Sequence, residues 1–223
     1  MIDAMVPAPA LWAAGACLAA SAALLVAEWR GSRGGRIVFK LAASPAFLLV
    51  AWLAGAWDSG YGRMLLLALA LSWLGDALLL SSRSREFLAG IGAFLLAHLV
   101  FACAFARLPM LGPALLAGGI GVGVAGAGVL AWLWPRLQGH YRGAVAAYVA
   151  AIVAMVTCAV GASAGVGDMR LAVAALAFAA SDVAVARNRF VAPGFVNRAW
   201  GQPLYYLAQL VFALSVAFVG DAG

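Results

Sequence analysis

Hydrophobic residues fill nearly the whole chain in long stretches, which are separated by short segments rich in charged residues, glycine or proline. The stretches contain about 17 to 24 residues each, and an α-helix rises about 1.5 Å per residue, so each is long enough to cross a membrane. The pattern predicts eight transmembrane helices, at residues 9–27, 37–57, 64–80, 87–106, 113–134, 141–164, 169–186 and 200–219. Because no stretch remains for a soluble domain, we expect residues 1–223 to form one integral membrane domain, an all-α polytopic helix bundle.

The composition agrees with this pattern. Of 223 residues, 66% are hydrophobic and 10% are charged, and the mean hydropathy of +1.03 is typical of integral membrane proteins. No basic segment precedes the first stretch and no convincing cleavage site follows it. We therefore expect this stretch to be retained as a helix rather than removed as a signal peptide.

The net charge of +6 comes from basic residues that flank the predicted helices. Eleven of the 14 lysine and arginine residues lie near the loops that follow the first, third, fifth and seventh helices: Arg30, Arg33, Arg36, Lys40, Arg83, Arg85, Arg136, Arg142, Arg187, Arg189 and Arg198. Short loops rich in lysine and arginine stay in the cytoplasm. We therefore expect a protein of a bacterial inner membrane with both termini outside the cytoplasm, and we expect no nucleic-acid partner.

Two aspartates, Asp76 and Asp182, lie inside the predicted helices. A carboxylate at membrane depth costs at least a few kcal/mol unless it is paired, hydrated or protonated, so such residues usually mark a functional site. A small residue precedes each aspartate, in the similar segments 69–76 and 175–182. If the chain consists of two parallel four-helix halves, both aspartates lie at one depth, four residues from a cytoplasmic helix end. Chance similarity between alanine-rich helices is the alternative.

Few other polar residues fall within or beside the predicted helices: Lys40, Ser44, Ser72, His98, Tyr148, Gln202, Tyr205, Tyr206 and Gln209. On the last helix, Gln202, Tyr205 or Tyr206, and Gln209 follow helical spacing and form one polar stripe. The fourth helix has an aromatic face that suits either an acyl chain or ordinary helix packing: Phe87, Gly90, Phe94, His98, Phe101 and Phe105. The six glycines between positions 118 and 128 predict a close-packed face on the fifth helix.

The residue types give little support for a metal site. The chain has only two histidines, His98 and His140, and its three cysteines lie inside predicted helices without paired spacing. A zinc site would have to combine Asp76, Asp182 and His98, which is not a common set of zinc ligands. We therefore expect neither a metal nor a cofactor.

The order and spacing of the polar and aromatic residues resemble those of the YhhN family of lysoplasmalogenases. The resemblance extends over residues 40–209 and rests on Lys40, Gly75, Asp76, Leu79, Phe87, Gly90, Phe94, His98, Phe105, Phe178, Ser181, Asp182, Tyr206 and Gln209. Two positions depart from the family pattern, because Pro45 is separated from Lys40 and Phe101 stands where tyrosine is common.

The resemblance implies hydrolysis of the vinyl ether of 1-alkenyl lysophospholipids, which yields a fatty aldehyde and glycerophosphocholine or glycerophosphoethanolamine. This chemistry needs one acid and one carboxylate, for which Asp76 and Asp182 are the candidates. Two carboxylates in a poorly solvated site do not both ionise easily, so one is expected to keep its proton. Five residues are candidate substrate-binding or supporting residues: Lys40, His98, Tyr148, Tyr206 and Gln209.

A second function remains open at this point. A proton-coupled transporter of small molecules or lipids would use the same aspartates as a proton relay, and parallel half-repeats suit that function as well. The sequence does not decide the oligomeric state, and for either function the expected neighbours are lipids.

Overall fold

The computed structural model describes residues 6–81 and 83–219, which form eight helices long and apolar enough to cross a membrane. They are α1 (Ala8–Trp29), α2 (Arg33–Leu53), α3 (Gly60–Leu78), α4 (Ser84–Phe105), α5 (Gly112–Leu133), α6 (Gly139–Val166), α7 (Arg170–Phe190) and α8 (Phe195–Val219). A short 3-10 helix, η1 (Trp134–Arg136), follows α5. The predicted all-α membrane bundle is confirmed.

Several helices, α2, α7 and α8 among them, extend beyond the predicted limits into polar sequence. Helix α2 begins at Arg33, where the Ser32 hydroxyl caps the helix by accepting a hydrogen bond from the Gly35 amide at 3.2 Å. Helix α8 begins at Phe195, and α7 continues to Phe190. These turns are too polar to count as membrane-spanning sequence, yet they continue the helices and carry basic and amide side chains.

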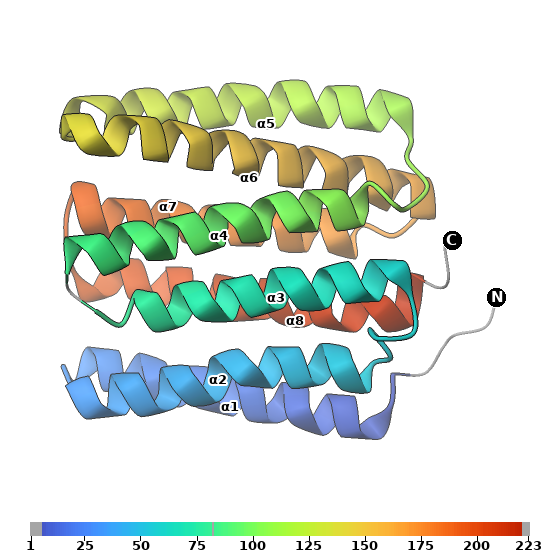
Figure 1. Ribbon diagram of the computed structural model, residues 1–223, viewed down its shortest axis with the longest axis horizontal. Coiled ribbons are helices and arrows are strands. Elements are labelled where there is room, and N and C mark those ends of the chain that lie inside the picture. Colours follow the sequence, from blue (N-terminus) through green and yellow to red (C-terminus); the bar gives the residue numbers. More distant parts are fainter. Residues whose placement is uncertain (1–5, 82, 220–223) are drawn as a thin grey trace.

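Consecutive helices pack as antiparallel hairpins (Figure 1). The connections α1–α2, α3–α4, α5–α6 and α7–α8 all lie at one end of the bundle, on the left in Figure 1. This end carries most of the arginines, and we call it the basic end. Gly31, in the α1–α2 turn, has a φ of 66°, a left-handed conformation that favours glycine.

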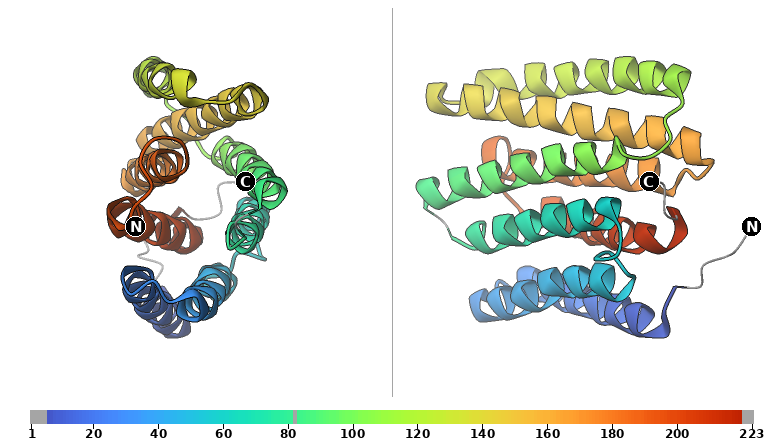
Figure 2. Two further views of the ribbon diagram at one scale, coloured as in Figure 1. Left: turned by 90° about the vertical axis from the view of Figure 1, so that its left-hand side faces the viewer. Right: turned by 45° about the vertical axis from the view of Figure 1, so that its right-hand side comes forward.

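The helix contacts follow the pattern expected of two four-helix halves. Viewed along the helices, the α1–α2 and α5–α6 hairpins lie at opposite ends of an elongated ring, with the α3–α4 and α7–α8 hairpins on its two sides (Figure 2). Helix α2 packs against α3 and α8, while α6 packs against α7 and α4. Exchanging α1–α4 with α5–α8 converts the first set of contacts into the second.

An aromatic cluster fills the interior between α4, α7 and α8. Phe101, Phe105, Phe178 and Phe212 are fully buried, and Phe101 lies with its ring 4.8 Å from that of Phe212 and 6.2 Å from that of Phe178. Such aromatic contacts add to the packing of α4 against α7 and α8. Phe101 and Phe105, on the half of α4 away from the basic end, therefore belong to the hydrophobic core.

Helix α5 packs mainly against α6, partly through glycines. A Cβ atom added at Gly118 or Gly126 would lie 2.8 Å from Val160 or Val153 of α6, so these positions require glycine for close approach. A Cβ atom at Gly121, Gly123 or Gly128 would meet no atom within 4 Å. The predicted close-packed glycine face is correct for Gly118, Gly119 and Gly126 and wrong for the other three.

Candidate active site

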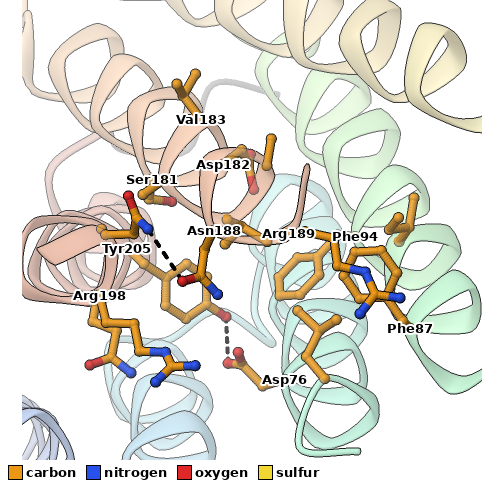
Figure 3. A pocket seen from close by; sticks show the side chains of 18 of the residues that line it. Asp76, Phe87, Phe94, Ser181, Asp182, Val183, Asn188, Arg189, Arg198 and Tyr205 are labelled. Atoms are coloured by element: carbon orange, nitrogen blue, oxygen red, sulfur yellow. Dashed lines mark hydrogen bonds between the residues drawn. The ribbon is translucent and has the colours of Figure 1, made fainter. Parts of the chain in front are cut away.

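A cavity of about 390 Å³ lies inside the bundle toward the basic end, and both intramembrane aspartates line it. Figure 3 shows Asp76 and Asp182 on different walls of this cavity, on α3 and α7 respectively. The volume is within the range of small-molecule sites. The two residues with the strongest sequence signal for function therefore line one cavity.

Asp76 is 4% exposed and bonded on both of its oxygen atoms. Lys40 Nζ lies 2.9 Å from Oδ1, while the Ser44 and Tyr205 hydroxyls each donate to Oδ2 at 2.7 Å. Lys40 and Ser44 are four residues apart on α2, so both face the aspartate from one side of that helix. A lysine side chain and two hydroxyl donors thus satisfy both oxygen atoms of this buried carboxyl group.

Tyr206 acts on Asp76 through Ser44. Its hydroxyl lies 3.1 Å from Ser44 Oγ. Because Ser44 donates its single hydroxyl proton to Asp76, Tyr206 is the donor in its contact with Ser44. Adjacent tyrosines of α8 thus support Asp76 in different ways, Tyr205 directly and Tyr206 through one intermediate.

Asp182 has a different set of partners. The Tyr148 hydroxyl donates to Oδ1 at 2.9 Å, and His98 Nε2 lies 3.1 Å from Oδ2 without the alignment of a good hydrogen bond. His98 is fully buried, with its ring 4.5 Å from that of Phe178. Asp182 therefore lies beside an imidazole and a phenol, whereas Asp76 lies beside a lysine side chain and two hydroxyl groups.

The hydrogen bonds of His98 define where its proton lies. Its Nδ1 atom is 2.6 Å from the Phe94 carbonyl oxygen, and a carbonyl only accepts, so we assign a proton to Nδ1. The Nε2 atom is then the ring nitrogen on the side of Asp182, 3.1 Å from Oδ2. It is the ring nitrogen available for proton exchange with the carboxyl group.

The two aspartate sites use equivalent helices. Asp76 on α3 contacts residues of α2 and α8, and Asp182 on α7 contacts residues of α6 and α4. This is the exchange expected of two related halves. The carboxylates share no hydrogen-bond partner within residues 6–81 and 83–219. One fold pattern therefore supports two carboxyl groups of different chemical character.

The lining of the cavity differs between the helices that contribute to it. Helices α1, α2 and α8 contribute polar side chains, and we call this side the polar branch: Glu28, Arg36, Lys40, Asn197, Arg198 and Gln202. Helices α4, α5 and α6 contribute mainly apolar side chains, and we call this side the apolar branch: Phe87, Ile91, Val129, Leu133, Val145 and Val149. Asp76 contacts Lys40 of the first side, and Asp182 contacts Tyr148 of α6. This arrangement suits an amphiphilic ligand.

A model of the YhhN family matches residues 35–216. The chain belongs to the YhhN family. A Mycobacterium bovis protein named lysoplasmalogenase is 37% identical over 149 residues, which are 65% of this chain and 55% of that protein. A Bos taurus protein named lysoplasmalogenase TMEM86A is 33% identical over 153 residues, 66% of this chain and 62% of that protein.

An Escherichia coli protein named uncharacterized membrane protein YhhN is 36% identical over 135 residues, 58% of this chain and 61% of that protein. The matched part of the chain thus spans little more than half of the mycobacterial relative. No solved structure matches the chain significantly. The comparisons confirm the family resemblance that the spacing of the site residues indicates.

The structure of this YhhN protein brings most of the predicted site residues together. Lys40 contacts Asp76, while His98 and Tyr148 contact Asp182. Gln209 is different, because it is fully buried, does not line the cavity and has no hydrogen-bond partner for its amide atoms in the described part of the chain. No three histidine, cysteine, aspartate or glutamate side chains cluster as metal ligands among the described residues.

Two direct partners of Asp76 in this YhhN protein are absent from the predicted site. Tyr205 and Ser44 both donate to the carboxylate, whereas Tyr206 was the tyrosine of α8 expected in the site. On α8, both Tyr205 and Tyr206 fit the helical spacing of the polar stripe, so the sequence did not show which of them faces Asp76. The i, i+4 spacing of Lys40 and Ser44 on α2 was the available signal for Ser44.

The expectation that each aspartate lies four residues from its helix end is wrong. Asp76 lies two residues before the end of α3, roughly 3 Å along the helix, and Asp182 lies eight residues before the end of α7, roughly 12 Å. The difference arises because α7 continues through polar residues to Phe190. Asp182 thus lies farther from the end of its helix than Asp76 does.

Gly75 allows α4 to pack beside the aspartate of this YhhN protein. A Cβ atom at this position would lie 2.6 Å from the Phe94 ring. That ring has little freedom to move, because it packs against Phe178 and Tyr205 with ring centroids 6.3 and 5.9 Å away. Since the Phe94 carbonyl also orients His98, the glycine before Asp76 supports both aspartate sites.

Proposed function

We propose that this YhhN protein hydrolyses the vinyl ether bond of 1-alkenyl lysophospholipids. The observation that carries the proposal is one cavity that is lined by an ion-paired carboxylate and a His–Asp pair and by both polar and apolar side chains. The names of the mycobacterial and bovine relatives support the same activity. The products are a fatty aldehyde and a glycerophosphate ester such as glycerophosphoethanolamine.

The substrate lies across the cavity in this proposal. Its single alkenyl chain occupies the apolar branch near Asp182, and its glycerol and headgroup occupy the polar branch near Asp76. The vinyl ether, which joins these two parts of the molecule, is then held between the aspartates. A lysolipid suits the cavity because it has one chain to place rather than two.

The Asp182–His98 pair serves as the acid. It transfers its proton to the alkene carbon one bond beyond the ether-linked carbon, which produces an oxocarbenium ion. The ionised Asp76 carboxylate stabilises this cation electrostatically and accepts a proton from the attacking water, in the manner of the carboxylate pair of glycosidases. The product of this step is a hemiacetal.

Collapse of the hemiacetal restores both groups. Asp76 returns its proton to the departing glycerol oxygen, the carbon–oxygen bond breaks, and the hemiacetal hydroxyl gives its proton to the Asp182–His98 pair. Protons balance over the cycle, and one water molecule is consumed. Lys40 keeps Asp76 ionised before the reaction, and Tyr148 and Tyr205 hold the two carboxyl groups in place.

The orientation in the membrane follows from the basic end. Eleven lysine and arginine residues lie at or near this end and three, Arg63, Arg107 and Arg170, lie near the other. The distribution supports a basic end in the cytoplasm and termini outside it. Substrate then enters from the inner leaflet of the membrane in which the protein resides.

Release of aldehyde from 1-alkenyl lysophosphatidylethanolamine by the detergent-purified protein tests the function. The saturated 1-alkyl ether and added EDTA are controls. Asp76→Asn and Asp182→Asn are expected to lower kcat at least about a hundredfold, and Asp58→Asn, an exposed carboxylate outside the cavity, is expected to leave it unchanged. Aldehyde release at the wild-type rate by either folded cavity variant would falsify the two-carboxylate mechanism.

A further inference from the structure

The polar branch of the cavity contains an excess of positive charge. Three carboxyl groups line the cavity, and each has a partner. Glu28 lies 3.0 Å from Arg198, Asp76 lies 2.9 Å from Lys40, and Asp182 lies 3.1 Å from His98. Two further arginines, Arg36 and Arg189, also line the cavity. The cavity can therefore accept additional negative charge.

The two remaining arginines differ in their surroundings. Arg189 lies over the Phe87 ring with its guanidinium carbon 4.3 Å from the ring centroid, and it donates to the Tyr141 hydroxyl at 3.3 Å. Arg36 forms no ion pair within the described ranges, and its Nε atom is buried there without a hydrogen-bond partner. A buried, unpaired guanidinium N–H is costly unless a ligand or water satisfies it.

Arg36 also lies at a suitable distance from the aspartate site. It precedes Lys40 by four residues on α2, so the two side chains share a helix face and start roughly 6 Å apart along the axis. In a lysophospholipid, the glycerol carbons separate the ether oxygen from the phosphorus by five covalent bonds, which cover a comparable length. A substrate with its vinyl ether near Asp76 places its phosphate near Arg36.

A second hollow beside the cavity continues the positive surface. It has a volume of about 380 Å³, shares Arg36, Leu80 and Ser81 with the main cavity, and adds Arg33 and Arg83 to its lining. Arg83 is partly neutralised by Glu86, 3.2 Å away. The phosphate of a bound lysolipid would therefore meet Arg36 first and have further arginines beyond it.

We propose that Arg36 binds the headgroup phosphate of the lysophospholipid and so selects phosphorylated substrates over neutral 1-alkenyl glycerols. The guanidinium offers paired N–H donors that match phosphate oxygens. The proposal rests on the proposed function for the position of the vinyl ether, but the phosphate contact itself does not require turnover. Arg36 is thus a specificity-determining residue rather than a member of the acid–base machinery.

Binding of non-hydrolysable ligands tests this proposal separately from activity. The ligands are 1-alkyl lysophosphatidylethanolamine and 1-alkyl glycerol of equal chain length, titrated against purified protein in one detergent. Arg36→Gln is expected to weaken binding of the phospholipid about ten- to hundredfold and to leave binding of the alkyl glycerol within about twofold. Arg36→Lys keeps the charge but loses the planar arrangement of donors. It is expected to bind the phospholipid less tightly than the wild type and more tightly than Arg36→Gln.

Arg142→Gln is the matched control, because Arg142 is at the same end of the bundle but lies outside the cavity, over the Trp134 ring. The melting temperature of each variant shows whether it is folded. Equal losses for both ligands, no loss for either, or the same loss in Arg142→Gln would overturn the role of Arg36. Displacement of the phospholipid by equimolar inorganic phosphate would also overturn it, since the site would then take free phosphate.

The outcome is distinguishable from failure of the proposed function. Phosphate-selective binding that depends on Arg36 supports the headgroup site even if no aldehyde forms from the alkenyl substrate. Aldehyde release by a wild-type protein that binds both ligands equally well overturns the headgroup site and leaves the hydrolase intact.

Discussion

His98 presents Nε2 to Asp182 Oδ2 at 3.1 Å while the Phe94 carbonyl, 2.6 Å from Nδ1, occupies its other nitrogen. A histidine held in this way has one nitrogen that is not engaged by the backbone, and that nitrogen lies beside a carboxyl group. In the proposed mechanism His98 and Asp182 together supply the proton that is transferred to the substrate, whereas Lys40 and Asp76 do not.

We expect His98→Gln to lower kcat about a hundredfold with little change in KM. Glutamine is polar and similar in length, but its amide does not gain and lose a proton in the required range. The measurement is the rate of aldehyde release at saturating substrate. A His98→Gln protein with wild-type kcat across the pH range would show that the imidazole is only a packing residue.

Lys40 gives a second prediction. In Lys40→Met the cation 2.9 Å from Asp76 is lost, and the buried carboxylate keeps only two neutral hydroxyl donors. Removing one partner of a buried ion pair is strongly unfavourable, so we expect kcat to fall about tenfold or more and the melting temperature to fall with it. Lys40→Arg, which retains the charge, is the control and should keep more of the activity. A methionine variant with the wild-type kcat would contradict the ion-pair role.

The adjacent tyrosines of α8 are expected to differ in importance. Tyr205→Phe removes a direct donor to Asp76 and is expected to lower kcat about tenfold or more, since hydrogen bonds to charged groups are the stronger ones. Tyr206→Phe removes only a donor to Ser44 and is expected to reduce kcat less than about threefold. The measurement is kcat of both variants under the same conditions. A larger loss in Tyr206→Phe than in Tyr205→Phe would contradict the direct contact of Tyr205 with Asp76.

The apolar branch leads to a prediction on chain length. Val149 lines it on α6, and Val149→Trp is expected to fill the branch and to shift the preference toward shorter alkenyl chains. The ratio of kcat/KM for a long and a short chain is expected to fall about tenfold, since roughly 0.8 kcal/mol is lost for each methylene that is no longer buried. Val124→Trp on the exposed face of α5 is the control and should keep the wild-type ratio.

Gly75 is expected to be required for both stability and activity. An alanine Cβ would overlap the Phe94 ring, and overpacking of this kind typically destabilises by about 1–3 kcal/mol. We expect Gly75→Ala to lower both the melting temperature and kcat. Gly92→Ala on α4, where a Cβ atom meets nothing within 4 Å, should change neither. Equal melting temperatures for Gly75→Ala and the wild type would mean that Phe94 moves without cost.

Sequence by itself determined the membrane class, the eight helices and the two intramembrane aspartates. These properties depend on local composition: a long apolar stretch must leave water, and a carboxylate within it needs a partner, whichever helix provides one. The same reasoning placed Lys40, His98 and Tyr148 among the candidates, because few other polar groups lie within the apolar stretches.

Tertiary structure decided which of these groups meet. Successive residues of a helix point about 100° apart, so sequence spacing did not choose between Tyr205 and Tyr206, and it did not show that Ser44 faces Asp76 or that Gln209 faces away from the cavity. Helix packing also placed Lys40 beside Asp76 and His98 beside Asp182. That difference depends on how α2, α4, α6 and α8 are rotated against the aspartate helices, which no local sequence pattern indicates.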